Sequence, residues 1–220
     1  MPQPKRIICV SHLTGAEGET VARRVAERLG LRYVDDEIIE TAAEWTDLDP
    51  SVVGDVERRR SLLARIGESI RGTSLPSRPD AAVQRRSGAA LRDVPSSDDL
   101  RALIRDVIRE AAVEGNTVIA SHAASLALAD REDVLRVLIT ASPKTRADRI
   151  MDARSVDSRR AESILADEDA ARADYLRRFH GVERELPTHY DLVVNTDALS
   201  AERGAELIVL AAEGSGVKPS

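Results

Sequence analysis

The chain has 220 residues, of which 42% are hydrophobic and 32% are charged, and its formal net charge is −6. This length suits one domain, or one domain with an inserted segment. An acidic balance argues against a general nucleic-acid-binding protein, which needs a basic surface. No apolar run approaches the roughly 20 residues of a membrane span, and the apolar stretch near the N-terminus is too short for a signal peptide. We therefore expect a cytoplasmic protein with neither a membrane nor a nucleic-acid partner.

The first forty residues alternate between strand and helix patterns. A continuous, β-branched run over 6–11 predicts a buried strand, and a loop over 12–19 follows it. Apolar residues at helical spacing from Thr20 predict a helix that Gly30 ends, and 31–34 predicts a second short strand. Because strands joined through helices form parallel sheets with right-handed crossovers, this order favours an α/β fold.

The middle of the chain departs from this alternation. A helix is predicted over about 49–70, and a connector containing Pro, Ser and Gly follows over 73–97. Since strand and helix patterns resume after the connector, we do not place a domain boundary there. The prediction is a single domain over 1–220, with a helical insert and connector at about 49–97.

The second half returns to strands and amphipathic helices. The predicted elements are a helix from 97 that ends at Gly115-Asn116, strands over 117–121 and 134–139, a helix opened by Pro143, a long charged helix over 157–179, a strand over 191–195 and a closing helix over 201–212.

The loop after the first predicted strand stands where phosphate-binding loops stand. Such loops use glycines to converge backbone amides on an anion at a helix N-terminus, and a Lys and a Ser or Thr then reach the phosphates and Mg²⁺. Gly15, Gly18 and Thr20 are present, but no lysine is near, and Glu17 and Glu19 add negative charge. A like-charge contact at ~4 Å costs roughly 4 kcal/mol at an effective dielectric of ~20. Two interpretations stay open, a variant anion site and an unused strand–helix turn.

Several segments, in order, resemble the cytidylate kinase-like family. They are Ser11-His12, the loop 15–20, Asp35-Asp36, the strand and turn 137–143 with Arg146 and Arg149 after it, the charged stretch with Asp167, Asp169 and Arg172, and the ending 190–196. The similarity covers about residues 6–212 apart from the connector.

The resemblance implies a fold, a chemistry and a set of site residues. The fold would be a three-layer, P-loop nucleoside-monophosphate-kinase-like sandwich with a five-stranded parallel sheet and a helical lid at about 154–180. The cofactors would be ATP and Mg²⁺, and the substrate a nucleotide or another small molecule. We assign catalytic roles to Arg146, Arg149 and Arg172, cofactor binding to His12, Gly15, Gly18, Glu19 and Thr20, metal binding to Thr20, and substrate binding to Asp35, Ser121 and His122.

Three positions depart from the family pattern. Glu19 replaces a loop arginine, Ser121-His122 replaces a Gly-Arg pair, and Ala123 replaces an aspartate. His12 and His122 are each either anion-binding donors or ordinary packing residues. The leading hypothesis is a phosphotransferase. The alternative is a non-catalytic nucleotide-sensing or protein-interaction module, which docks an acidic partner or an identical subunit through Arg58–Arg60 and Arg85-Arg86.

Overall fold

The computed structural model describes residues 7–35, 97–120 and 124–214. Its elements in chain order are β1 (Ile7–His12), α1 (Gly18–Leu29), β2 (Arg32–Val34), α5 (Ser97–Glu114), β3 (Thr117–Ala120), α6 (Ala124–Ala127), β4 (Val134–Thr140), α7 (Pro143–Arg154), α8 (Ser158–His180), the 3₁₀ helix η1 (Pro187–His189), β5 (Leu192–Asn195) and α9 (Ala201–Gly214).

The sheet has five strands in the order β2-β3-β1-β4-β5, and every neighbouring pair is parallel. β1 lies in the centre, where Ile7 pairs with Thr117 of β3 on one side and with Val134 of β4 on the other. A strand bonded on both edges and covered on both faces has no polar surface, which explains its continuous apolar run. The predicted five-stranded parallel sheet is confirmed.

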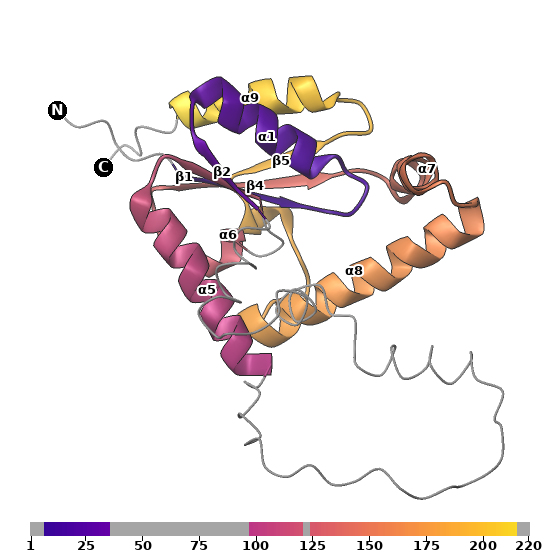
Figure 1. Cartoon of the computed structure of the whole chain (residues 1–220), viewed down its shortest axis with the longest axis horizontal. Coiled ribbons are helices and arrows are strands. Elements are labelled where there is room, and N and C mark those ends of the chain that lie inside the picture. Colours follow the sequence, from indigo (N-terminus) through magenta and orange to yellow (C-terminus); the bar gives the residue numbers. More distant parts are fainter. Residues whose placement is uncertain (1–6, 36–96, 121–123, 215–220) are drawn as a thin grey trace, which may run out of the picture.

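Helices cover both faces of this sheet (Figure 1), with α1 and α9 on one face and α5 and α6 on the other. Successive side chains of β1 alternate between the two layers. Ile8 and Val10 pack with the α1 and α9 residues, whereas Ile7 and Cys9 pack with α5 and α6. All four are at most 1% exposed, so β1 anchors both halves of the core.

α7 stands beyond the carboxyl end of β4, and α8 runs from there back toward the lower end of α5 (Figure 1). Ser142 caps α7 by accepting a hydrogen bond from the Thr145 amide, and Pro143 occupies the first turn, as the sequence predicted. Asp157 caps α8 in the same way through the Arg160 amide. The two helices share a small apolar cluster of their own, which contains Ala147, Ile150, Ala161 and Leu165. They therefore form a unit packed at the end of the sheet where ligands bind in open α/β folds.

The observed bounds differ from the predicted ones in a few places. α1 begins at Gly18, two residues before the predicted start at Thr20, and α9 continues to Gly214. The sequence did not predict α6 or η1, which are four and three residues long and too short to show a period. The helix predicted over 49–70 lies outside the described residues, as does the connector up to residue 96.

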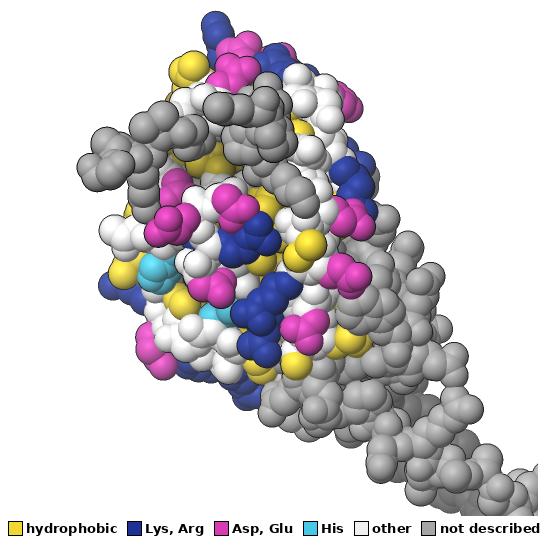
Figure 2. Space-filling model, turned by 90° about the vertical axis from the view of Figure 1, so that its left-hand side faces the viewer, with side chains coloured by type: hydrophobic (Ala, Val, Ile, Leu, Met, Phe, Trp, Pro, Cys, Tyr) yellow, Lys and Arg dark blue, Asp and Glu magenta, His cyan; other side chains and the backbone are white. Residues whose placement is uncertain are grey.

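In the described part of the chain, no helix is long and apolar enough to cross a membrane. On the face drawn in Figure 2, acidic and basic side chains are intermingled, and neither sign forms a continuous patch.

Candidate functional site

The β1–α1 loop (residues 13–17) turns sharply at the carboxyl edge of the sheet. Gly15 has φ +77°, and a Cβ added there would lie 2.8 Å from the Arg146 carbonyl oxygen. A Cβ added to Gly18 would lie 2.1 Å from Cβ of His12. Glu17 is also left-handed, with φ 61°, a conformation that costs a non-glycine residue energy. The loop therefore packs directly on α7 and on the end of β1, and both glycine positions exclude a side chain.

Every backbone carbonyl from His12 to Glu17 accepts a hydrogen bond. The donors, in order along the chain, are Arg172 Nη1 at 3.4 Å, the Ala16 amide at 3.0 Å, Arg146 Nε at 2.6 Å, Arg149 Nη1 at 3.1 Å, Thr196 Oγ1 at 3.0 Å and the Val21 amide at 3.0 Å. Four of these six donors are side chains from α7, α8 and the end of β5. The loop is thus held by its carbonyl groups from several elements.

The amide groups of the same segment are used much less. The Leu13 amide donates to Ile139 and the Ala16 amide to Leu13. The amides of Gly18, Glu19 and Thr20, in the first turn of α1, have no acceptor among the described residues. First-turn amides lack an intrahelical partner and carry the positive end of the helix dipole. The carbonyl groups of this segment are therefore bound by the protein, whereas the amide groups of the first turn of α1 are open. Open amides at a helix N-terminus are the arrangement that binds an anion.

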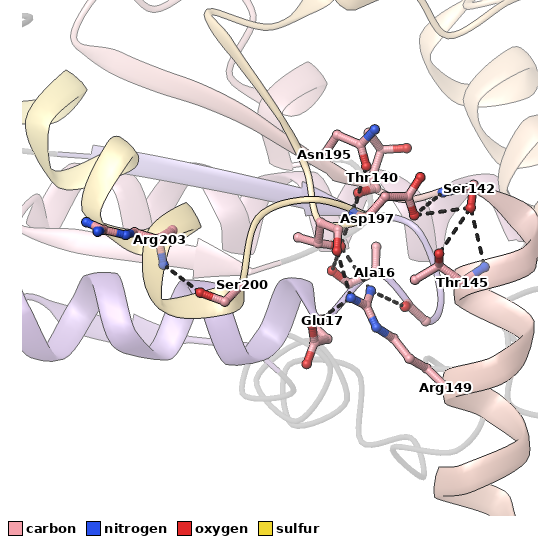
Figure 3. Close-up of polar contacts among 12 residues, drawn as sticks. Ala16, Glu17, Thr140, Ser142, Thr145, Arg149, Asn195, Asp197, Ser200 and Arg203 are labelled. Carbon is pink, nitrogen blue, oxygen red and sulfur yellow. Dashed lines mark hydrogen bonds and ion pairs between the residues drawn. The ribbon is translucent and has the colours of Figure 1, made fainter.

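Arg149 joins three parts of the site (Figure 3). Its guanidinium donates to the Gly15 carbonyl, to Thr196 Oγ1 at 3.0 Å and to the Thr196 carbonyl at 2.8 Å. It also forms an ion pair of 3.0 Å with Glu17. The negative charge that Glu17 brings to the loop is therefore balanced locally.

Arg146 and Arg172 are more deeply buried and each binds a carboxylate with two nitrogen atoms. Arg146 donates to Asp169 at 3.0 and 2.6 Å, and Arg172 donates to Glu185 at 2.9 and 2.6 Å. Their side chains are only 3% and 6% exposed. Desolvation by itself would lower the pKa of Arg172, but the hydrogen bond and charge of Glu185 raise it above its ordinary value. Arg172 is therefore charged and paired at neutral pH.

α8 also contacts the loop through Glu168. Thr14 Oγ1 donates to Glu168 at 2.5 Å, and Arg154 binds the other oxygen of Glu168 at 3.3 Å. Glu19 and Thr20 are exposed in the first turn of α1. The predicted catalytic arginines and cofactor-binding residues thus lie around one loop.

The imidazole of His12 lies against Gly18 and is largely enclosed. Burial, followed by the charge of Arg172, lowers its pKa below the ordinary value of 6.5, and the charge of Asp35 only partly opposes this. His12 is therefore neutral at pH 7. In this form the ring can give or accept a hydrogen bond but carries no charge.

Asp35 ends β2 and forms what we call the β2 edge cluster with Tyr33 and Arg23. The Tyr33 hydroxyl donates to Asp35 at 2.9 Å, Arg23 lies 3.7 Å from the same carboxylate, and its guanidinium stacks 4.3 Å from the centre of the Tyr33 ring. The side chain of Asp35 is 21% exposed. The carboxylate is thus fixed in position and remains accessible from one side.

No group of three or more His, Cys, Asp or Glu side chains within 7–35, 97–120 and 124–214 is arranged to hold a metal ion. The Thr20 hydroxyl and the Asp35 carboxylate are hard oxygen donors of the kind that suits Mg²⁺ alongside phosphate oxygens. Ser121 and His122, which the sequence assigned to the substrate, lie outside the described residues.

A model of the cytidylate kinase-like family matches residues 7–198. The chain belongs to this family. The match spans the β1–α1 loop, α7, α8 and β5, so the resemblance inferred from the ordered segments is confirmed. A search of curated proteins finds no match.

Several solved structures have a fold similar to that of this chain. A crystal structure of an uncharacterized protein from Eubacterium ventriosum is 15% identical, with a TM-score of 0.66, and the alignment covers 96% of this chain and 99% of that one. A shikimate kinase from Bacteroides thetaiotaomicron gives 15% identity, a TM-score of 0.53, and coverage of 94% and 98%. A gluconokinase from Sinorhizobium meliloti is 14% identical, with a TM-score of 0.50, and the alignment covers 96% of this chain and 94% of that one. At these identities the likeness concerns the fold, which is that of P-loop kinases.

Sequence reasoning missed several residues that complete this cytidylate kinase-like site. Thr196 and Glu185 bind the loop and its arginines, and Tyr190 donates to Glu185, yet none was assigned a role. Thr196 and Tyr190 stood in the ending that resembled the family, which was the available signal. Nothing in the sequence pattern singles out Glu185.

Proposed function

We propose that the protein is a phosphotransferase that moves a phosphoryl group from ATP to a nucleotide or another small molecule. The observation that carries the proposal is the polarity of the segment from His12 to Thr20, where the carbonyls are held by the protein and the first-turn amides are open. Backbone amides at a helix N-terminus bind phosphate without a lysine, because they combine hydrogen bonds with the helix dipole. Family membership supports the same conclusion.

In this proposal the amides of Gly15 and of residues 18–20 bind the donor phosphates. Arg149 is the most exposed of the three loop arginines, with 27% of its side chain accessible, and it stands beside these phosphates. Thr20 and Asp35 would hold Mg²⁺, which neutralises phosphate charge when bound. Asp35 also orients the acceptor. An acceptor oxygen would bond to the γ-phosphorus as the bond from that phosphorus to the β,γ-bridging oxygen breaks. ADP would leave, and a hydroxyl acceptor would release its proton to solvent.

The first experiment uses two glycines with the same left-handed conformation. Gly15 has φ +77° and contacts Arg146, whereas Gly30 has φ +62° at the end of α1 and open space around it. Calorimetry with Mg-ATP on the full chain should give micromolar binding that Gly15→Ala abolishes and Gly30→Ala preserves. Absence of Mg-ATP binding by the wild type at millimolar concentration would overturn the proposal.

A second experiment addresses transfer. Wild-type protein with Mg-ATP is tested for ADP formation against CMP, the other nucleoside monophosphates and small hydroxy acids. Formation of ADP that depends on one acceptor supports a kinase and identifies its substrate class.

One observation favours the alternative, a nucleotide-sensing module without catalysis. Each loop arginine is paired with a carboxylate of the protein itself. The pairs are Arg146 with Asp169, Arg149 with Glu17 and Arg172 with Glu185. No lysine lies near the loop in the sequence, so little net positive charge is available to stabilise a transferring phosphoryl group. Tight Mg-ATP binding without acceptor-dependent ADP formation would support this alternative.

A further inference from the structure

Two buried arginines meet the β1–α1 loop in the same arrangement. Arg146 gives both terminal nitrogens to Asp169 and aims Nε at the Thr14 carbonyl at 2.6 Å. Arg172 gives Nε and Nη2 to Glu185 and directs Nη1 to the His12 carbonyl at 3.4 Å. In both cases a carboxylate binds one side of the guanidinium and a loop carbonyl binds another.

In this geometry the carboxylate fixes the orientation of the arginine side chain. A guanidinium is planar with donors in fixed directions, so binding two of its nitrogens to one carboxylate fixes the direction of the remaining N–H groups. Buried charge also needs compensation, and removal of one partner leaves the other charge unbalanced. Asp169 and Glu185 therefore supply both the orientation and the charge balance for donors that hold the loop.

Glu185 is itself held by a chain of polar groups beneath the loop. The Tyr190 hydroxyl donates to Glu185 and also bonds the side chain of Ser11, the residue before His12. Ser11 Oγ in turn lies 3.1 Å from Ser125 Oγ of α6. Burial alone would raise the pKa of Glu185, but the hydrogen bonds and the charge of Arg172 together hold that pKa below its ordinary value. Glu185 is therefore ionised and fixed at neutral pH.

We propose that Asp169 and Glu185 are positioning residues for nucleotide binding: they hold Arg146 and Arg172 so that these arginines bind loop carbonyls and keep the loop amides facing the donor phosphates. The inference rests on the proposed function, since it assumes that the loop binds the phosphates of ATP. On this proposal, α8 helps to hold the loop in position. The two acidic residues, although they lie near a phosphate site, then favour the binding of phosphate.

This role and a purely electrostatic role predict changes of opposite sign. If the carboxylates only cancel arginine charge, removing one charge leaves the site more positive and strengthens the binding of Mg-ATP. If they position the loop, the same change weakens binding although the site becomes more positive. The sign of the change in affinity therefore separates the two roles.

The test measures Mg-ATP affinity by calorimetry for Asp169→Asn and Glu185→Gln in the full chain. We expect a loss of about tenfold for each, because a charge-assisted hydrogen-bond pair is disrupted. The control is Asp148→Asn, which makes the same charge change on α7, where Asp148 pairs with the exposed Lys144. It should stay within about twofold of the wild type. Unchanged or tighter binding by both test variants overturns the proposal.

A second readout does not depend on nucleotide binding. Backbone order parameters of residues 13–18 are measured by NMR relaxation in the free protein, where a rigid backbone gives about 0.85 and a flexible one less than about 0.6. We expect a drop in the loop for Asp169→Asn and Glu185→Gln but not for Asp148→Asn. If the wild type binds no Mg-ATP, the proposed function fails, and this comparison still tests whether the two carboxylates order the loop. An unchanged loop overturns that ordering.

Tyr190→Phe serves if either charge variant fails to fold. It keeps every charge and removes only the hydrogen bond to Glu185 and the contact with Ser11. The expected result is a smaller loss of Mg-ATP affinity, about threefold, with a lower order parameter at residues 13–15. Wild-type values for both measurements would overturn the part of the proposal that concerns Glu185.

Discussion

The β1–α1 loop and the β2 edge cluster both adjoin α1, yet they are held by different kinds of group. In the loop, consecutive backbone carbonyls are bound by side chains from α7, α8 and the end of β5. In the β2 edge cluster, the Tyr33 hydroxyl and the Arg23 guanidinium contact the carboxylate of Asp35, and the guanidinium also stacks on the Tyr33 ring. Backbone contacts tolerate changes of side chain that a side-chain cluster does not. Under the proposed function, the loop that binds the donor could therefore stay constant while the β2 edge cluster changes its acceptor.

Arg146→Ala should have the largest effect on the loop half. The change leaves Asp169 and the Thr14 carbonyl without their partner and removes a side chain that is 3% exposed. We expect a loss of about 3 kcal/mol in the free energy of unfolding, measured by urea denaturation. Lys144→Ala, on the same helix but with a side chain that is 87% exposed, should change it by less than about 0.5 kcal/mol. Equal losses for the two variants would contradict the loop's dependence on Arg146.

Thr196→Val removes one hydroxyl from the loop half and keeps the side-chain shape. Thr196 is 2% exposed and donates to the Ala16 carbonyl while accepting from Arg149. The expected loss in the free energy of unfolding is about 1–3 kcal/mol, because two buried polar groups lose their partner. Thr140→Val provides a comparison, since Thr140 meets Thr196 through its backbone carbonyl and its hydroxyl takes no part in the loop contacts described above. A Thr196→Val protein as stable as the wild type would show that the hydroxyl contributes little.

His12 responds to charges from both regions: its carbonyl accepts a hydrogen bond from Arg172, which lowers the pKa of the imidazole, and the charge of Asp35 raises it. Its pKa in the folded protein is below the value of 6.5 expected for the unfolded chain, so the unfolded state binds a proton first as the pH falls. The stability contributed by neutral His12 is therefore complete above about pH 6.5 and is lost as the pH falls through the lowered folded pKa.

His12→Gln should reduce this pH dependence, measured as urea midpoints between pH 7.5 and 5. His180, whose pKa burial lowers to about 4, adds a pH dependence of the same sign in this window, because its unfolded form gains a proton there and its folded form does not. The comparison is therefore made in a His180→Gln background. An identical pH slope with and without His12 would contradict the burial of the imidazole.

Arg23→Ala should have the smallest effect on stability and a selective effect on the β2 edge cluster. The side chain is 57% exposed and its distance to Asp35 is 3.7 Å, so the loss in the free energy of unfolding should be below about 1 kcal/mol. We expect a higher KM for the acceptor, because Asp35 loses a neighbour that fixes its orientation. Mg-ATP affinity should fall by no more than about threefold, because Thr20 and the loop amides still hold the donor. A large loss of Mg-ATP affinity would show that the two halves are not independent.

The sequence predicted the framework of the site better than its contacts. The alternation of strands and helices placed the loop after β1, and Pro143 marked the start of α7, because these signals are local. The family resemblance added the arginines of α7 and α8. It could not show that Arg146 meets Asp169, 23 positions further on, or that Arg172 meets Glu185, since partners of this kind are chosen by tertiary packing. The early start of α1 at Gly18 was also missed, because the left-handed turn at Glu17 has no reliable sequence signal.

The position of Cys9 gives the protein an internal reporter. It is the single cysteine of the chain, it has no exposed surface in the middle of β1, and burial raises the pKa of its thiol to about 12. The thiolate is the reactive form, so a thiol reagent can modify the native sheet only after β1 opens. The rate of labelling therefore measures how often the central strand separates from β3 and β4. Any ligand that binds the folded loop should slow this labelling, whatever its chemistry, which gives a screen for ligands that needs no assay of catalysis.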